Sequence, residues 1–206
     1  MTGKQQRTIL SSTIIISMLT TGCFSIKMIE ENSEQGHIRY SLKESAFSPE
    51  PLKHGLFTAW YPNGKKKNEV TYRNGKKHGI ETVWDAFGVK LRETRYRSGQ
   101  KSGKEIFWGP DGEKKKETTY KYGRRHGPEI TYHRNGTVAK IEHYFSGVKK
   151  GVETGFDTTG RKVYQVTFKD GKKDGKELFF DYSSGDKPVI TEIHWVNGAV
   201  VNSSEQ

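Results

Sequence analysis

A fixed spacing of glycines constrains this chain more than any other feature of its sequence. The main series recurs every 24 residues without slippage, at Gly55, Gly79, Gly103, Gly127, Gly151 and Gly175. Two further series keep the same step, one from Gly64 to Gly160 and one from Gly75 to Gly171. Self-similarity at a fixed period is the signature of an array, in which each repeat is one unit of supersecondary structure. The sequence therefore predicts a repeat protein over residues 53–200.

Each repeat predicts two short strands joined by turns. After Gly79, Ile80 and Trp84 fall on one face of an extended chain and Glu81 falls on the other, because side chains of a strand alternate. Turn dipeptides such as Asn74-Gly75 tolerate the positive φ of tight hairpins. The connections are too short for crossover helices, so consecutive strands must be antiparallel neighbours. We predict an all-β fold, an elongated, twisted antiparallel β-meander of six 24-residue repeats and about twelve strands.

Two columns of aromatic residues follow the same period. Because the repeat brings equivalent residues into register on neighbouring strands, we expect the rings to stack as the core of the sheet. A flat single layer would leave the face with the rings exposed to solvent, so the sheet is expected to curl over that face. The alternative is that Trp60, Trp84 and Trp108 form a sugar- or peptide-binding strip. The first column is Trp60, Trp84, Trp108, Tyr132, Phe156 and Phe180, and the second is Tyr72, Tyr96, Tyr120, Tyr144 and Phe168.

The first 22 residues have the layout of a secretory signal peptide. Lys4 and Arg7 form a positive start, Ile9–Leu19 an apolar core, and small residues lead up to Cys23. The apolar run is much shorter than the ~20 residues that a spanning helix needs, so no transmembrane helix is expected. Cys23 is the only cysteine, which excludes an intrachain disulfide and a metal site built on thiolates.

The end of this segment resembles the lipobox of bacterial lipoproteins, although Thr20 stands where that pattern prefers Leu. The resemblance implies cleavage before Cys23 and acylation of the thiol, with palmitate among the attached chains. Several acyl chains hold a protein firmly on a membrane, where a single short one binds marginally. Because Phe24 rather than Asp follows the cysteine, the resemblance also indicates the outer membrane of a Gram-negative bacterium. The alternative is an ordinary signal peptide followed by an incidental thiol.

The residues outside the array lack its period. We assign residues 1–22 to the signal peptide, 23–52 to the acylated cysteine and a flexible tether, 53–200 to the array, and 201–206 to a frayed tail. The tether mixes charges with Ser, Pro and Gly, and one isolated strand is expected near His37–Leu42. Such a tether would hold the array clear of the bilayer.

The repeat unit resembles a known family. Tyr72–Gly79 (YRNGKKHG) and Phe168–Gly175 (FKDGKKDG) are similar to MORN repeats, and more closely to the bacterial variant of YwqK-family antitoxins from toxin–antitoxin systems. The resemblance covers roughly residues 53–200. It implies a scaffold that different proteins use for different functions, with an antitoxin or immunity role among them. The export signal is a departure from a cytoplasmic antitoxin.

The chain is strongly basic, with a formal net charge of +11 at pH 7 that becomes +9 once Lys4 and Arg7 are removed. The excess lies in turns that the repeat places on the same edges, so two basic rows should flank the sheet. Such rows suit anionic lipid, lipopolysaccharide or an acidic partner. The alternative is that lysines at turns only prevent edge-to-edge association of strands. The residues predicted for anionic-surface binding are Lys76, Lys77, Lys101, Arg124, Arg125, Lys149, Lys150, Lys172 and Lys173.

The sequence shows no constellation of residues for catalysis. A carboxylate pair, a nucleophile with a base and a phosphate-cradling glycine loop are all missing, so we expect neither an enzyme nor a cofactor. His54, His78 and His126 precede repeat glycines at a predicted spacing of about 10 Å, too far apart to share a metal. The glutamates equivalent to Glu81 are expected to pair with Lys or Arg on neighbouring strands. Export argues against a nucleic-acid partner.

These features favour a lipid-anchored, non-enzymatic scaffold that binds another protein in the cell envelope. An immunity-type protein that blocks an incoming toxin falls within this hypothesis. The alternative is a binder of anionic lipid or lipopolysaccharide through the basic rows. A hydrolase is the third hypothesis, and the missing catalytic constellation argues against it.

Overall fold

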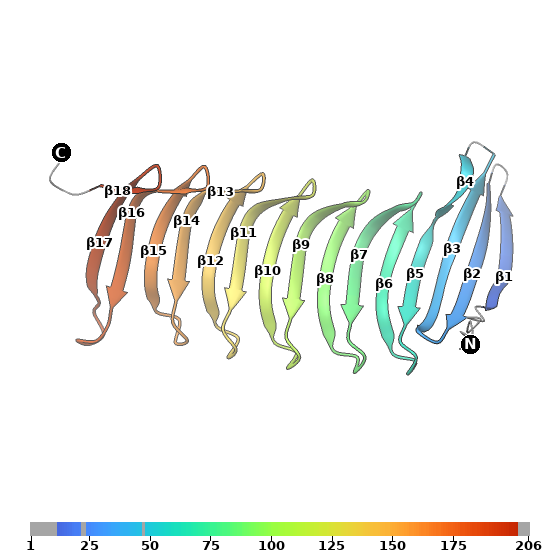
Figure 1. Ribbon diagram of the computed structural model, residues 1–206, viewed down its shortest axis with the longest axis horizontal. Coiled ribbons are helices and arrows are strands. Elements are labelled where there is room, and N and C mark those ends of the chain that lie inside the picture. The colour runs from blue at the N-terminus through green and yellow to red at the C-terminus, as the bar shows by residue number, and fades with distance from the viewer. Residues whose placement is uncertain (1–11, 22–23, 47, 202–206) are drawn as a thin grey trace, which may run out of the picture. The chain divides into compact units, whose positions relative to one another are not determined.

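A computed structural model describes residues 12–21, 24–46 and 48–201 of the chain (Figure 1). The chain divides into two compact units, unit 1 (Met1–Gln100) and unit 2 (Lys101–Gln206). All the helix or strand structure in the described ranges is β-strand. In those ranges, no helix has the length and hydropathy that crossing a membrane requires.

Unit 1 is an antiparallel meander in which consecutive strands lie side by side (Figure 1). Each strand pairs with the next, except that β3 pairs with both β4 and β5. The strands are β1 (Ser12–Thr21), β2 (Phe24–Ser33), β3 (Gly36–Ser45), β4 (Ser48–Lys53), β5 (Gly55–Trp60), β6 (Lys66–Arg73), β7 (Lys76–Trp84) and β8 (Lys90–Arg97).

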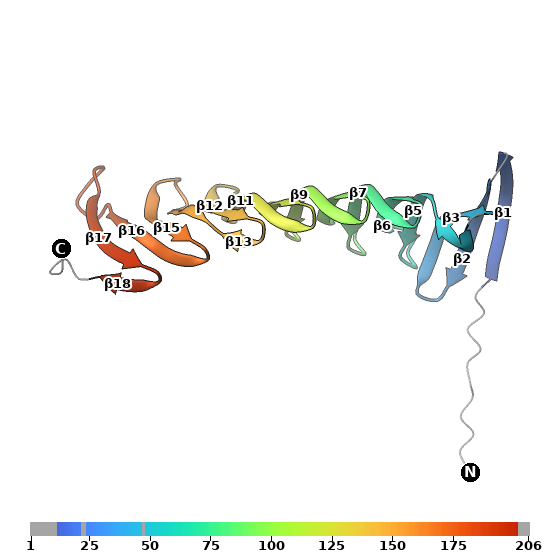
Figure 2. The same cartoon turned by 90° about the horizontal axis from the view of Figure 1, so that it is seen from above.

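Unit 2 continues the same pattern, and its strands are also bent along their length (Figure 2). Each strand pairs with the next, and β12 pairs with both β13 and β14 because one strand is interrupted at Lys150. The strands are β9 (Gln100–Trp108), β10 (Lys114–Lys121), β11 (Arg124–Tyr132), β12 (Val138–Phe145), β13 (Val148–Lys149), β14 (Gly151–Phe156), β15 (Lys162–Lys169), β16 (Lys172–Asp181), β17 (Val189–Val196) and β18 (Ala199–Val201).

The predicted all-β antiparallel meander is confirmed. If β13 and β14 are taken as one interrupted strand, β5 to β17 supply the twelve strands expected of the array, and β18 adds one short strand. Neighbouring repeats are also linked through their turns. Gly99 N donates to Lys77 O at 2.8 Å, and Asn135 Nδ2 donates to Thr158 O at 2.8 Å. Turn residues therefore join one repeat to the next, as expected where no single repeat folds alone.

The flexible tether predicted for residues 23–52 is replaced by strands β2, β3 and β4. The isolated strand expected near His37–Leu42 lies within β3, which forms a hairpin with β2 through ten residue pairs. Ile29 of β2 is buried, and Tyr40 of β3 lies opposite it. The Tyr40 ring also lies 6.3 Å from that of Phe57 in β5, so this segment packs against the start of the array although it lacks the period. Cys23, residues 1–11 and residues 202–206 lie outside the described residues.

The buried face of the sheet is the one opposite to the face that was predicted to be buried. On β7, Glu81 is 4% exposed, whereas its neighbour Ile80 is 48% exposed. Val70 and Thr94 lie opposite Glu81 on the flanking strands and are fully buried. The first ring column is only half-buried. The prediction of a core built on those rings was therefore wrong, although the alternation of faces on which it rested was right.

A bulge in each repeat explains which face is covered. In unit 1 the register between β6 and β7 shifts at Gly79, which has a φ of 84°. Only glycine adopts such a conformation at low cost. A bulge bends the strand that carries it, so the residues before Gly79 fold back over Glu81. The same register shift recurs beside Gly127 and Gly175 in unit 2.

Candidate functional site

Among the described residues, buried carboxylates at equivalent repeat positions lie on the covered face of the sheet, one in unit 1 and four in unit 2. They are between 2% and 8% exposed. Burial of a carboxylate is costly unless the charge is paired and hydrogen-bonded. These carboxylates are Glu81 in unit 1, and Glu105, Glu129, Glu153 and Glu177 in unit 2.

A cation from four residues earlier in the chain meets each of these carboxylates. In a flat strand, such residues would be about 13 Å apart at ~3.3 Å per residue. The glycine bulge shortens that separation, and Lys77 Nζ lies 2.5 Å from Glu81 Oε1. The pairs in unit 2 are Lys101–Glu105 (2.6 Å), Arg125–Glu129 (3.8 Å), Lys149–Glu153 and Lys173–Glu177 (2.6 Å).

The second ring column covers these cations. Lys77 Nζ lies 5.1 Å from the centroid of the Tyr96 ring, and the guanidinium of Arg125 lies 3.8 Å from that of Tyr144. Cations placed over aromatic faces gain electrostatic attraction, more so where water is excluded. Each repeat from Gly79 onwards thus supplies one carboxylate, one cation and one ring, and we call this set of residues the ladder. Lys101–Tyr120, Lys149–Phe168 and Lys173–Trp195 complete it in unit 2.

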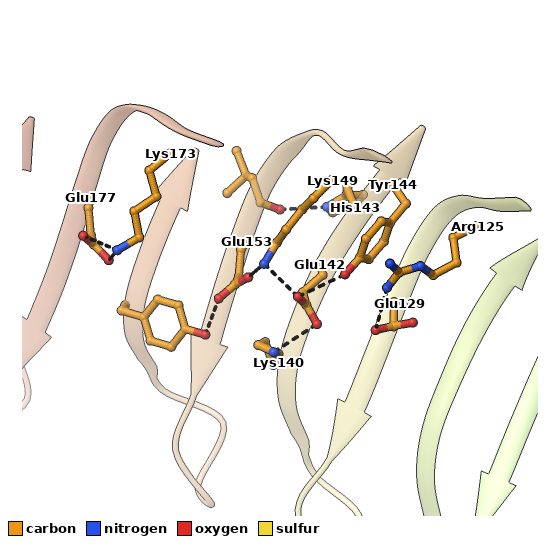
Figure 3. A network of polar contacts seen from close by, with 12 residues as sticks. Arg125, Glu129, Lys140, Glu142, His143, Tyr144, Lys149, Glu153, Lys173 and Glu177 are labelled. Carbon is orange, nitrogen blue, oxygen red and sulfur yellow. Dashed lines mark hydrogen bonds and ion pairs between the residues drawn. The ribbon is translucent and has the colours of Figure 1, made fainter. Parts of the chain in front are cut away.

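The ladder is most heavily connected around Lys149 (Figure 3). Its ammonium group bonds Glu153 and lies 2.7 Å from Glu142 Oε1, which belongs to the neighbouring strand β12. Glu142 also accepts hydrogen bonds from Lys140 at 3.0 Å and from the Tyr144 hydroxyl at 3.4 Å. One lysine therefore neutralises two buried carboxylates on adjacent strands.

The electrostatics of the ladder favour ionised carboxylates. Burial by itself would raise the pKa of Glu142, but hydrogen bonds from Lys149 and Lys140 outweigh it and lower the pKa from 4.5 to about 2. The pKa of Glu81 is also lowered, since Lys77, Asn68 and Arg92 outweigh its burial. The pKa values of the tyrosine hydroxyls beside these carboxylates shift in the opposite direction, upwards. Burial and the nearby Glu105 raise the pKa of Tyr120 to about 12.

Acid should weaken unit 2 through Glu142. Its pKa is lower when folded than when unfolded, so its stabilisation is complete above about pH 4.5 and is lost as the pH falls towards 2. Glu142→Gln should cost about 2 kcal/mol at pH 7 and almost nothing near pH 2. Urea unfolding at several pH values measures both. Glu113→Gln, at an exposed carboxylate, should change stability by less than about 0.5 kcal/mol throughout. An equal cost of Glu142→Gln at pH 7 and pH 2 would contradict this assignment.

The structure divides the nine predicted basic residues into two groups. Lys77, Lys101, Arg125, Lys149 and Lys173 are the ladder cations, and their charges are already matched by buried carboxylates. The other four side chains are exposed and keep their charges available for an anionic partner. These four are Lys76, Arg124, Lys150 and Lys172.

The first ring column lies on the other face of the sheet, which we call the open face. Trp60 and Trp84 are half-buried there, and Leu56 and Ile80 of the same two strands are 55% and 48% exposed. In the described ranges, no further layer of strands or helices packs on this face. In unit 2 the equivalent residues Trp108, Tyr132, Phe156 and Phe180 are also half-buried. The open face thus offers half-buried rings and exposed aliphatic side chains to a partner.

Metal binding finds no support in the described residues, where no three His, Cys, Asp or Glu side chains gather closely enough to hold an ion. The histidines before the repeat glycines have other contacts. His126 lies against the Phe145 ring at 4.8 Å, and the Asn74 backbone N–H donates to His54 Nδ1 at 3.4 Å.

The hairpins of the array match a known repeat. A family model described as the MORN repeat variant matches residues 53–74 and 125–145. These two segments are MORN-variant repeats. The first spans β5 and β6, and the second spans β11 and β12, so each match is one hairpin of the meander. MORN repeats generally serve as non-enzymatic scaffolds. A search of curated proteins found no match to the chain.

A cleft at the hairpin tips of unit 2, which Tyr122 and Phe145 line together with basic residues, was not predicted from the sequence. The signal that would have found it is a break in the repeat. At these two positions, aromatic residues replace the small polar and basic residues that the other hairpins of the array carry.

Proposed function

We propose that this chain is a lipid-anchored, non-enzymatic scaffold that binds another protein in the bacterial cell envelope. The observation that carries the proposal is the open face. Half-buried rings recur there at equivalent positions of successive repeats, next to exposed Leu56 and Ile80 in unit 1. Exposed apolar patches framed by polar residues are typical of sites where proteins bind one another.

An immunity or antitoxin role is one form of this scaffold. It is supported by the resemblance of Tyr72–Gly79 and Phe168–Gly175 to the repeats of YwqK-family antitoxins. Because the leader directs export, the blocked toxin would arrive from outside the cell and not from the cytoplasm.

The scaffold is tested by affinity purification of the full chain from envelopes after crosslinking. We expect a stoichiometric protein partner that remains bound at high salt, because an interface built on apolar area is little weakened by ionic screening. Leu56→Lys with Ile80→Lys should abolish its capture. Phe87→Lys is the control, because Phe87 is an even more exposed apolar residue, at 80%, but lies in a turn and not on the open face. If the Leu56→Lys, Ile80→Lys double variant captures the partner as well as Phe87→Lys does, the open face is not the binding surface.

The anchor is proposed to be Cys23, acylated after cleavage of the leader. Cys23→Ser should eliminate the incorporation of labelled palmitate, since the acceptor thiol is gone, whereas Ser25→Ala should retain it. Autoradiography of the purified protein measures the difference. Absence of label from the wild-type chain, or label retained by Cys23→Ser, would disprove acylation at this residue.

Cleavage before Cys23 has a structural consequence. Strand β1 (Ser12–Thr21) comes from the leader and pairs with β2 along most of its length. The mature protein would lack β1, and β2 would become the first strand, directly after the acylated residue. Its hairpin with β3, paired from Phe24↔Ser45 to Ser33↔Gly36, does not depend on β1.

The second candidate function is binding of anionic lipid or lipopolysaccharide. It is favoured by the four basic side chains that stay outside the ladder, Lys76, Arg124, Lys150 and Lys172. Capture of anionic vesicles that disappears at high salt, with no stoichiometric protein partner, would favour this function over the scaffold.

A further inference from the structure

A basic, aromatic cleft lies between two neighbouring hairpin tips of unit 2. One tip joins β10 to β11 and the other joins β12 to β13. The cleft has a volume of about 450 Å³ and is lined by Lys121, Tyr122, Arg124, His126, Phe145 and Ser146. It is large enough for one bulky side chain of a ligand, and it is separate from the buried ladder.

Tyr122 is out of place by the rules of the repeat. It is 74% exposed and has a φ of 51°, a backbone conformation that bulky residues rarely adopt. The same conformation recurs at the equivalent tip positions, where small polar residues suit it. Those residues are Asn74, Ser98, Ser146, Asp170 and Asn197. A residue that is unfavourable for this backbone conformation, Tyr122, thus occupies the tip at which its ring lines the cleft. Strained residues of this kind concentrate at binding sites.

Phe145 breaks the repeat in the same place. It is 58% exposed, its ring lies 4.8 Å from that of His126, and Lys150 Nζ lies 5.9 Å from its centroid. The equivalent residues 24 positions apart are all basic, namely Arg73, Arg97, Lys121 and Lys169. An exposed aromatic ring therefore replaces an expected cation directly beside the second exposed ring.

The cations around the two rings have no carboxylate to neutralise them. Lys121, Arg124 and His126 line the cleft and Lys150 borders it, while no acidic residue lines it. Among the described residues, Lys121, Arg124 and Lys150 form no ion pair, in contrast to the ladder cations. The cleft thus combines apolar surface with uncompensated positive charge.

We propose that this cleft binds an acidic segment of a protein partner that carries one large apolar side chain. The apolar side chain would lie between Tyr122 and Phe145, and its flanking carboxylates would pair with Lys121, Arg124 and Lys150. Rings with bordering cations suit such a ligand, because apolar burial supplies affinity and charge pairs supply orientation.

The confinement of the rings favours a peptide over a membrane surface. A bilayer would engage the whole row of tips, yet the next tip of unit 2 carries Lys169 and Asp170 in place of rings. Asp170 would also be repelled by anionic headgroups. The proposal goes beyond the open face, since it uses residues that the Leu56 and Ile80 variants leave unchanged.

The test measures fluorescence anisotropy of the full chain with a short labelled peptide that has a single phenylalanine between runs of glutamate. Replacing the phenylalanine of the peptide by alanine should weaken binding by about tenfold or more. Phe145→Lys should do the same, even though it adds a positive charge that would tighten a purely electrostatic complex. Tyr122→Ser should also weaken binding about tenfold, and it should melt no lower than wild type, because serine suits this backbone conformation.

Charge has its own matched pair of variants. Arg124→Glu should weaken peptide binding about tenfold, whereas Lys172→Glu, at the equivalent position two repeats later, should change it less than about twofold. Binding that survives Tyr122→Ser and Phe145→Lys would overturn the proposal. So would a wild-type chain that ignores the peptide, or one that instead uses these residues to capture phosphatidylglycerol vesicles. Loss of peptide binding with retention of the open-face partner in the same variants supports two separate sites.

Discussion

Lys149→Ala should destabilise unit 2 by about 3 kcal/mol, whereas Lys150→Ala should cost less than about 0.5 kcal/mol. The two lysines are adjacent in the chain, and burial separates their expected effects. Lys149 is 20% exposed and bonds Glu142 and Glu153, while Lys150 is exposed. Without Lys149, Glu142 keeps Lys140 as its charged partner at 3.0 Å, whereas Glu153 keeps only the hydrogen bond from the Tyr164 hydroxyl at 2.6 Å. Thermal unfolding followed by circular dichroism should show a midpoint roughly 6–12 °C lower.

A rescue variant identifies the cause of that loss. Lys149→Met keeps the apolar stem that lies against Phe168 but removes the charge. Adding Glu142→Gln to Lys149→Met should recover part of the lost stability, because it removes one of the stranded charges. Additive losses in the double variant would mean that packing of the lysine stem, and not charge, stabilises this part of the ladder.

The meander was predictable from the sequence because its causes are local. Turn residues such as Asn74-Gly75 need a positive φ, and Asn74 has a φ of 48°. Alternation along Ile80–Trp84 separates two faces whatever the rest of the sheet does. A period of 24 residues then repeats these local choices, so that pairing of consecutive strands follows.

The covered face was not predictable from alternation, because hydropathy pointed to the wrong side. Ile80 and Trp84 are more apolar than Glu81, yet the glycine bulge bends the strand towards Glu81. The available signal was the spacing of Lys77 and Glu81, which recurs in every later repeat with a cation four residues before each glutamate. In a flat strand, Lys77 and Glu81 would be too far apart to form an ion pair. They can pair only because the bulge at Gly79 brings the two charges together.

The N-terminal strands were not predictable from the sequence for a related reason. The 24-residue period begins only at residue 53, and the charged residues of β2 resemble those of a linker. Strand pairing there depends on cross-strand partners rather than on repetition. Tyr40 donates to Glu31 at 2.9 Å, and Arg39 to Glu30 at 3.2 Å. Partners of this kind can be recognised only once the register of β2 and β3 is known.

Gly36→Ala should destabilise unit 1 by about 3 kcal/mol or more, the largest effect expected of any glycine there. Gly36 belongs to none of the three glycine series, yet its surroundings are tighter than those of the series members. A Cβ at this position would lie 2.1 Å from the carbonyl oxygen of Trp60, and the φ of 129° is itself unfavourable for alanine. The oxygen cannot retreat without disturbing the pairing of β3 with β5, because that pairing begins at the adjacent His37↔Trp60 and includes only three residue pairs.

Gly64→Ala is the matched control for this prediction. Gly64 has a φ of 80° with nothing within 4 Å of an added Cβ, so its substitution carries only the conformational cost of about 1–2 kcal/mol. The difference between the two variants in urea unfolding isolates the steric term. Hydrogen exchange should locate it, with faster exchange at His37–Arg39 in Gly36→Ala alone. Equal costs for both variants would mean that β3 and β5 tolerate separation, and that the N-terminal strands are not firmly joined to the array. A larger cost at Gly36 would instead make the close contact with Trp60 the point that joins them.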